Sequence, residues 1–231
     1  MKAATLIALA AAALSTVGAL AYGLAAPQAT LLGPALTRAG AGRQVALTFD
    51  DGPSAYTAGV LDVLRARGVH ATFFVCGANV ERYPELVRRI LREGHELGNH
   101  TWSHPYLHLK SEAAIALEID RTQDAVLRIA GVRPSLFRPP FGVRWFPLWG
   151  LLRERKMTMA LWSIRPYDGR DPAATIAKTT LDSLHPGAII VLHDGFETHA
   201  PAEVDRSEML RALPSIIDGA VRAGYTFRAL R

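Results

Sequence analysis

The chain has 231 residues, of which 49% are hydrophobic and 20% charged, a balance that predicts one sizeable globular domain. Its formal net charge is +5, but the Lys and Arg residues are scattered and no run of five basic residues occurs, which argues against a nucleic-acid partner. The single cysteine, Cys76, excludes an intramolecular disulfide, and its apolar neighbours predict a buried structural thiol.

The first 26 residues form a leader that is almost wholly apolar after Lys2. Such a stretch is typical of a secretory signal peptide or of an uncleaved membrane anchor, since about 20 apolar residues can cross a bilayer. We therefore expect an exported protein. It would be secreted or periplasmic if the leader is cleaved, or attached through residues 3–26 to the outer face of the cytoplasmic membrane. Residues 27–42, rich in Pro, Gly and Ala, predict a linker, and residues 43–231 predict a single catalytic domain.

From Arg43 onward, apolar runs alternate with amphipathic segments. The apolar runs predict strands at 45–49, 71–75, 96–98, 136–138, 158–162, 188–192 and 225–228. The amphipathic segments predict helices at 58–67, 84–93, 112–130, 147–155, 172–184 and 205–223. This alternation favours an α/β fold with parallel strands, in the form of a closed or nearly closed β/α barrel. Functional side chains of such barrels lie on the loops that follow the strands.

Two adjacent carboxylates, Asp50 and Asp51, end the first predicted strand just before a Gly52-Pro53 turn. Neighbouring anions repel each other, so a cation is expected to hold them. A divalent metal bound by one carboxylate would leave the other free for proton transfer. Successive strand side chains point in opposite directions, but the Gly-Pro turn breaks this alternation, so the residues alone leave both assignments open.

Two histidines, His100 and His104, follow the third predicted strand at a spacing of four residues. On one helical turn they would share a face and bind one metal ion, although Pro105 limits any helix and favours a loop. Together with a carboxylate they supply three ligands, the usual number in a catalytic zinc site that keeps one position for water. Zinc proteases carry Glu beside the first His, where this chain has Thr101, so a general base must come from elsewhere.

Two later strands also end in polar side chains. Arg138 is followed by Pro139 and Pro140, which restrict the backbone to a rigid loop where a guanidinium can orient a carboxylate. His193 ends an apolar strand, and an imidazole there is suited to protonating a leaving amine. The remaining histidines lack such a setting and are interpreted as structural or solvated: His70, His95, His108, His185 and His199.

These segments, taken together and in this order, resemble the NodB-like polysaccharide deacetylases, carbohydrate esterase family four. Residues 48–53 (Thr-Phe-Asp-Asp-Gly-Pro) are similar to the first motif of that family and residues 100–104 to the second. Residues 138–141 (Arg-Pro-Pro-Phe) are similar to the third motif, and residues 191–193 (Val-Leu-His) to the fifth. The resemblance spans about residues 43–231 and implies a distorted (β/α)7 barrel of mostly parallel strands.

The resemblance also implies a role for each of these residues. Asp50 would be the general base and His193 the general acid, with Arg138 orienting Asp50. A divalent ion, most often Zn2+ but alternatively Co2+ or another metal, would bind Asp51, His100 and His104. The backbone N–H of Phe141 would stabilise the oxyanion together with the metal. The expected substrate-binding residues are Pro139, Pro140, Phe141, Leu192 and Trp162.

The fourth motif departs from the family pattern. The family shows an Asp-Trp pair in this region, with a further Asp upstream, whereas this chain has Asp168 followed by Gly169. In the family this Asp tunes the acid histidine, so the role is carried over to Asp168. The missing indole leaves one wall of the acyl pocket open to another side chain, and Trp162 is a candidate.

The resemblance implies metal-dependent hydrolysis of the N-acetyl group of a polysaccharide that contains N-acetylglucosamine, either a chitin oligomer or peptidoglycan, with release of acetate. The expected partner is therefore a carbohydrate polymer or oligomer. Two alternatives stay open at this point. One is a deacylase of a lipid-linked sugar or of O-acetyl esters on xylan. The other is an inactive domain that only binds polysaccharide, for which the altered fourth motif is the sole support. The sequence identifies neither the natural glycan nor an oligomeric state.

Overall fold

The computed structural model describes residues 32–196 and 204–231, together with Ser15 and Gly18. Its strands are β1 (Gln44–Asp50), β2 (Thr72–Val75), β3 (Glu96–Asn99), β4 (Leu136–Phe137), β5 (Thr158–Met159), β6 (Ile189–His193) and β7 (Thr226–Phe227). They form one sheet in the order β5-β4-β3-β2-β1-β6, with β7 paired to the start of β1, and every pairing is parallel. The carboxyl ends of the strands therefore meet on one side of the sheet.

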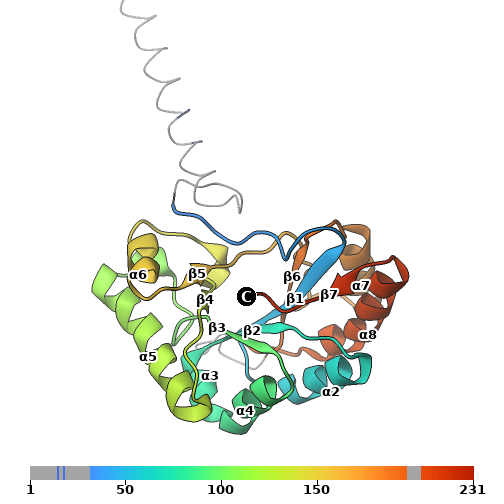
Figure 1. Ribbon diagram of the computed structural model, residues 1–231, viewed down its shortest axis with the longest axis horizontal. Coiled ribbons are helices and arrows are strands. Elements are labelled where there is room, and N and C mark those ends of the chain that lie inside the picture. The colour runs from blue at the N-terminus through green and yellow to red at the C-terminus, as the bar shows by residue number, and fades with distance from the viewer. Residues whose placement is uncertain (1–14, 16–17, 19–31, 197–203) are drawn as a thin grey trace, which may run out of the picture.

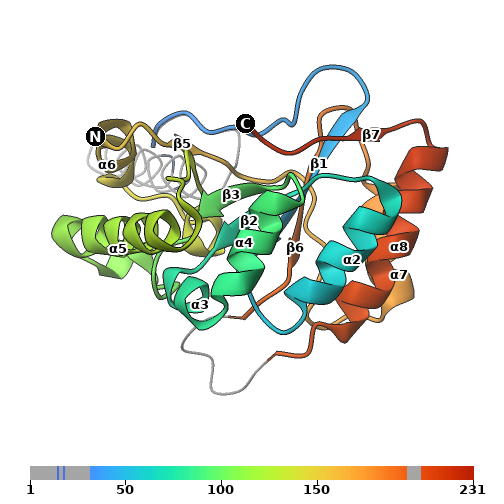
Figure 2. The same cartoon turned by 60° about the horizontal axis from the view of Figure 1, so that its bottom comes forward.

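The helices surround this sheet (Figure 1). They are α2 (Thr57–Arg67), α3 (Gly77–Arg82), α4 (Pro84–Arg92), α5 (Glu112–Ala130), α6 (Leu148–Glu154), α7 (Ala173–Asp182) and α8 (Ser207–Arg222). Figure 2 shows α5, α4, α2 and α8 following one another along the outside of the sheet, and each neighbouring pair is in contact. Local signals fix the ends of the longest helix: the Ser111 side chain caps the start of α5, and Gly131 ends it in a left-handed conformation.

The alternation of side chains along β1 separates the core from the site. Val45, Leu47 and Phe49 pack outward into the large apolar cluster shared with the helices, where the Phe49 and Phe73 rings stack 5.1 Å apart. Ala46 belongs to the smaller cluster inside the barrel. Because successive strand side chains point to opposite faces, Thr48 and Asp50 also face the barrel interior.

The barrel wall is not closed by a pairing between β5 and β6. Residues 32–42 cross this gap as a loop in which Leu36 forms a parallel bridge with Ala160 (Figure 1). The Leu36 N–H donates to Met159 O at 2.7 Å on the β5 side, and the Ala39 N–H donates to Gly187 O at 2.9 Å just before β6. Leu32 and Ala39 are buried. The described part of the predicted linker therefore packs on the domain and completes the barrel wall.

The seven predicted strands and the six predicted helices are present, and their ends agree with the prediction to within three residues. The predicted barrel of parallel strands is confirmed. The helix α3 was not predicted; it has only six residues and is separated from α4 by Tyr83 alone. Cys76, just before α3, is fully buried as predicted, and burial raises the pKa of its thiol, so it stays protonated.

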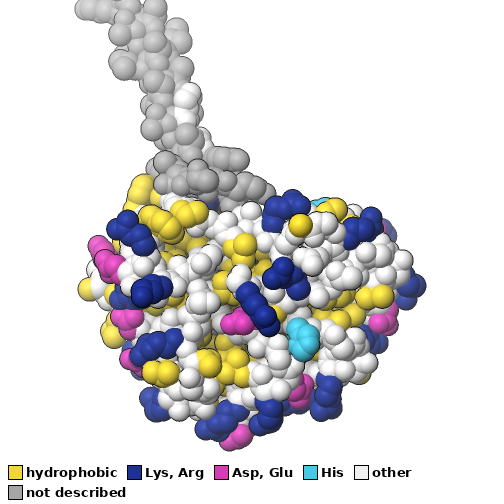
Figure 3. Space-filling model, viewed as in Figure 1, with side chains coloured by type: hydrophobic (Ala, Val, Ile, Leu, Met, Phe, Trp, Pro, Cys, Tyr) yellow, Lys and Arg dark blue, Asp and Glu magenta, His cyan; other side chains and the backbone are white. Residues whose placement is uncertain are grey.

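The predicted leader, residues 1–26, lies outside the described residues apart from Ser15 and Gly18. Among the residues that the structure describes, no helix combines the length and the hydropathy needed to cross a membrane. On the face of the domain shown in Figure 3, Lys and Arg side chains are spread among acidic and apolar ones rather than gathered in one patch. This agrees with the scattered basic residues of the sequence.

His95, just before β3, is a buried histidine that the site does not use. Its Nδ1 accepts a hydrogen bond of 3.1 Å from the Ala71 N–H, so the proton of the neutral ring is on Nε2. Burial, reinforced by the charge of His70, lowers the pKa of His95 to about 4. The folded state therefore favours the neutral ring.

We expect the free energy of unfolding to decrease as the pH falls from about 6.5 toward 4. The unfolded state binds a proton at His95 near its ordinary pKa of about 6.5, whereas the folded state resists protonation until about 4. The His95 contribution is thus intact above pH 6.5 and is lost on acidification. In His95→Asn, Oδ1 can accept the Ala71 N–H without titrating. Urea unfolding of both proteins across this pH range should give a flatter pH dependence for the variant, and equal dependences would contradict the assignment.

Candidate active site

The two adjacent carboxylates lie at the carboxyl end of β1 and are both buried, Asp50 with 2% and Asp51 with 4% of its surface exposed. Asp50 is the last strand residue and pairs with His193 of β6. Asp51 leaves the strand in a left-handed conformation, with φ of 71°. This change of backbone direction turns the two carboxylates toward different partners.

The two histidines of the second motif lie on a loop after β3, not on a helix. Thr101 and His104 have positive φ values of 68° and 56°, a left-handed backbone that excludes a regular helix here and agrees with the loop that Pro105 favours. The ring centroids of His100 and His104 are 4.9 Å apart. The Glu118 carboxylate of α5 holds the loop, accepting hydrogen bonds of 2.8 Å from the N–H groups of Trp102 and Ser103.

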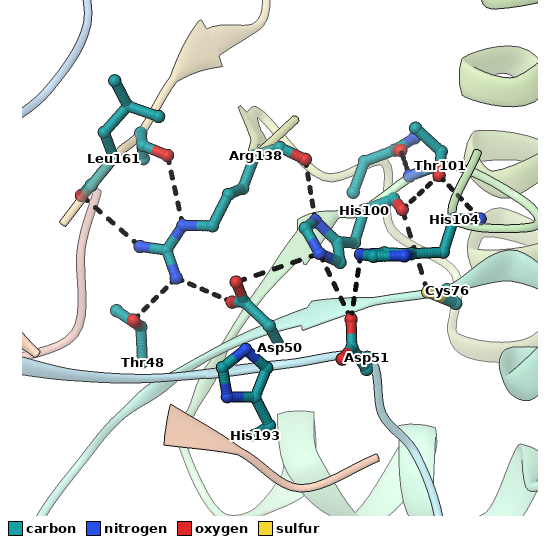
Figure 4. A network of polar contacts seen from close by, with 12 residues as sticks. Thr48, Asp50, Asp51, Cys76, His100, Thr101, His104, Arg138, Leu161 and His193 are labelled. Carbon is teal, nitrogen blue, oxygen red and sulfur yellow. Dashed lines mark hydrogen bonds and ion pairs between the residues drawn. The ribbon is translucent and has the colours of Figure 1, made fainter. Parts of the chain in front are cut away.

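Asp51, His100 and His104 converge on one point (Figure 4). Asp51 Oδ1 lies 3.4 Å from His100 Nε2 and 3.3 Å from His104 Nε2, and one ligand atom from each residue lies within 4.8 Å of the others. His100 Nδ1 lies 2.7 Å from the Arg138 carbonyl, so it carries the proton and leaves Nε2 as a free lone pair. Asp51 Oδ1 is buried without a hydrogen-bond partner among the described residues.

The protonation states also suit a cation. Burial alone would raise the pKa of Asp51, but its contacts with His100 and His104 bring it well below its ordinary value. Burial lowers the pKa of His104 to about 4, so its ring is neutral near pH 7. An ionised carboxylate and neutral imidazoles with an unsatisfied buried oxygen fit a divalent metal ion.

Asp50 is held by a different partner. Arg138, at the end of β4, donates from Nη1 to Asp50 Oδ1 at 2.6 Å and to Thr48 Oγ1 at 2.7 Å. The Arg138 side chain is completely buried, and its Nε donates to Ala160 O at 3.2 Å. Asp50 Oδ2 lies 3.8 Å from His100 Nε2, at the edge of the metal-ligand cluster. The geometry thus separates the two carboxylates: Asp51 faces both imidazoles, and Asp50 is paired with a guanidinium.

His193 ends β6 and points toward the two carboxylates (Figure 4). Asp168 accepts two hydrogen bonds from it, one from the backbone N–H at 2.6 Å and one from Nδ1 at 2.9 Å. Burial alone would lower the pKa of His193, but the charge and hydrogen bond of Asp168, followed by the charges of Asp51 and Asp50, outweigh burial and raise it. Nε2 is then the nitrogen left to carry a transferable proton.

These residues line a cavity of about 520 Å³. Phe141 and Trp162, two of the predicted substrate-binding residues, also line it. Phe141 has a φ of 59°, and within its turn the Gly142 N–H donates to Pro139 O at 3.0 Å. In the part of the chain that is described, the Phe141 N–H makes no hydrogen bond and is available to an incoming oxygen.

Three predicted substrate-binding residues do not line this cavity. Leu192 is fully buried in the outer apolar cluster, because alternation along β6 points it toward the helices while His193 points inward. Pro139 and Pro140 are buried as well and shape the turn that carries Phe141. Pro139 and Pro140 therefore position neighbouring residues and do not form part of the cavity surface.

Several site residues were not predicted from the sequence. Arg206, which precedes α8, lines the cavity, and Asn79 of α3 donates to Asp51 O at 2.7 Å. Glu118 holds the histidine loop from the middle of α5. No local pattern distinguishes these three from surface residues. Thr48 did carry a signal, since it is a polar residue within the apolar run of β1.

The fold and the site together define a class of protein. A parallel β/α barrel that places an Asp-His-His metal-ligand set, a second carboxylate and an Asp-paired imidazole at the ends of its strands is organised for metal-assisted hydrolysis. The chain belongs to the polysaccharide deacetylase family, whose sequence model matches residues 37–160. The family resemblance inferred from the motifs is thereby confirmed.

Individual relatives agree with this membership. The chain is 44% identical over 164 residues to the peptidoglycan-N-acetylmuramic acid deacetylase PdaC of Bacillus subtilis, covering 68% of this chain but only 34% of PdaC. It is 36% identical over 196 residues to a chitooligosaccharide deacetylase of a Bradyrhizobium species, covering 81% of this chain and 89% of that relative. The crystal structure of the peptidoglycan N-acetylglucosamine deacetylase Bc1960 superposes with a TM-score of 0.78 at 33% identity, covering 84% of this chain and 89% of that one.

Proposed function

We propose that this protein hydrolyses the N-acetyl group of a polysaccharide that contains N-acetylglucosamine, either a chitin oligomer or peptidoglycan, and releases acetate. The observation that carries the proposal is the cluster of Asp51, His100 and His104 around an unsatisfied carboxylate oxygen, beside Asp50. The names of the relatives, which include a chitooligosaccharide deacetylase and peptidoglycan deacetylases, support the substrate class.

Asp51, His100 and His104 would hold a divalent metal, and two imidazoles with one carboxylate favour Zn2+. When bound, such an ion lowers the pKa of a water molecule and polarises a carbonyl oxygen. The remaining chemistry belongs to the chain. Asp50, oriented by Arg138, accepts a proton from the attacking water.

Two further groups complete the proposed reaction. The Phe141 N–H donates a hydrogen bond to the oxyanion that forms as the amide carbon becomes tetrahedral. His193 then protonates the departing amine through Nε2, while Asp168 holds Nδ1 and so fixes the orientation of the ring. The carbon–nitrogen bond breaks, and acetate and a free amino sugar result.

We further propose that the protein is exported and that residues 43–231 form the catalytic domain, with residues 32–42 packed against it. The apolar leader of residues 1–26 supports export. Relatives named for peptidoglycan support the same location, because that polymer lies outside the cytoplasmic membrane.

Metal removal provides the test of this function. We expect the purified protein to release acetate from a defined N-acetylglucosamine oligomer or from peptidoglycan. Dialysis against a chelator should abolish this activity, and addition of Zn2+ or Co2+ should restore it. Mass spectrometry of the sugars before and after incubation measures the loss of acetyl groups. Acetylated xylan serves as the parallel ester substrate. Absence of acetate release from both N-acetylated glycans by the metal-loaded protein would contradict the proposal.

A further inference from the structure

Arg206 lies in space that the absence of a side chain at Gly169 leaves open. A Cβ atom at Gly169 would come within 2.8 Å of Arg206 Nη1, so the guanidinium lies directly against this glycine. Gly169 follows Asp168, which is the partner of His193. The wall of the cavity at this point is therefore a cationic group, where the family resemblance predicts an indole.

The Arg206 side chain is built into the site rather than free in solvent. The residue is 7% exposed, and its Nε donates a hydrogen bond of 2.7 Å to Gly195 O, which fixes the direction of the guanidinium. Nη2 lies 3.9 Å from Asp51 Oδ2. Among the described residues the two Nη atoms make no hydrogen bond, so both can donate to a ligand.

The carboxylates of the site balance only part of the charge on this side of the cavity, because among them only Asp51 lies within ion-pair distance of Arg206. Asp50 is paired with Arg138, and Asp168 with His193. Arg165 and Arg170 also line the cavity, both exposed, and neither takes part in an ion pair among the described residues. Three arginines thus line the cavity, and a bound divalent ion would add to its positive charge.

We propose, on the basis of the function proposed above, that this wall selects substrates carrying a carboxylate close to the N-acetyl group. Arg206 is the specificity-determining residue, and Arg165 and Arg170 attract the anion at the rim. A planar guanidinium binds a carboxylate through two parallel hydrogen bonds, and partial burial strengthens the pair. N-acetylmuramic acid is such a substrate, because it is an N-acetylated amino sugar whose neighbouring oxygen bears a substituent with a carboxylate. N-acetylglucosamine has no carboxylate that Arg206 could bind.

The test compares two substrates that differ by a methyl group on each carboxylate, which removes its negative charge. One is a peptidoglycan tetrasaccharide of alternating N-acetylglucosamine and N-acetylmuramic acid, and the other is the same compound with its carboxylates converted to methyl esters. We expect kcat/KM for removal of the muramic acid N-acetyl group to be about 10- to 100-fold higher for the acid, since hydrogen bonds to a charged group are worth that factor. The preference should decrease as ionic strength rises.

The variant Arg206→Gln should reduce this preference at least about 10-fold. Arg92→Gln, an exposed arginine on α4, is the matched control and should keep the wild-type ratio. Arg170→Gln at the rim should reduce the ratio of kcat/KM between acid and ester by a smaller factor. If Arg206→Gln does not fold, this second variant still tests whether the arginines of the cavity select the carboxylate. A wild-type ratio near one, or a ratio unchanged in Arg206→Gln, would overturn the inference while the deacetylase function stands. Failure to deacetylate any glycan, the tetrasaccharide and N-acetylglucosamine oligomers included, would overturn both.

Discussion

Asp50→Asn is expected to lower the rate of N-acetyl hydrolysis by about 10²- to 10⁴-fold while the metal content of the protein stays at the wild-type level. The substitution preserves the shape of the side chain, and the amide oxygen can still accept the 2.6 Å hydrogen bond from Arg138 Nη1. An amide, however, cannot take a proton from water. The expected result therefore separates proton transfer from folding and from metal binding.

Asp51→Asn is the matched comparison, because it makes the same chemical change one residue further along. Asp51 Oδ1 lies between the two imidazoles, so this variant should lose bound metal as well as activity. Metal content measured by elemental analysis, alongside acetate release, distinguishes the two. An active Asp50→Asn would show that Asp50 is not the base. Loss of metal from Asp50→Asn with retention in Asp51→Asn would show that the two roles are exchanged.

The elements that the sequence predicted correctly are those with local signals. The strand β1 follows from an apolar run that only Thr48 interrupts, and α5 from a capping serine at 111 and a glycine at 131. The loop of residues 32–42 has no such pattern, because its hydrogen-bond partners, Met159 and Gly187, are distant in sequence. The short helix α3 depends likewise on packing, since a Cβ at Gly77 would collide with the Trp102 ring of the histidine loop.

The same distinction holds for the site. Asp50 and Asp51 are adjacent in sequence, and His100 and His104 are four residues apart, so a short motif identifies each pair. The local residue pattern could not choose between the two carboxylates, which only the family resemblance assigned, because the choice depends on the left-handed backbone of Asp51 and on Arg138. The Arg206 guanidinium lies against Gly169, a glycine far away in sequence, and no single-sequence pattern records such a pairing.

Arg138→Met is expected to lower the free energy of unfolding by about 3–5 kcal/mol. Arg138 is completely buried, and its guanidinium lies 4.0 Å from the centre of the Phe74 ring. Burial lowers the pKa of this guanidinium, and the charge and hydrogen bond of Asp50 offset part of that effect. Removing the cation leaves the buried Asp50 carboxylate without its main partner. The control is Arg155→Met on the outside of the barrel, where the partly exposed pair with Asp120 should contribute at most about 1 kcal/mol.

A second substitution separates the unpaired charge from the lost packing. In Arg138→Met with Asp50→Leu no buried charge is left without a partner, and replacing both members of a buried ion pair by apolar side chains is often close to neutral. We therefore expect urea unfolding to give a higher free energy of unfolding for the double variant than for Arg138→Met alone. The double variant should be inactive. If the double variant is instead destabilised by the sum of the two single effects, Arg138 stabilises the fold through its contacts with Thr48, Phe74 and the Ala160 carbonyl rather than through Asp50. The pairing of Arg138 with Asp50 would then serve the orientation of the catalytic carboxylate and not the stability of the barrel.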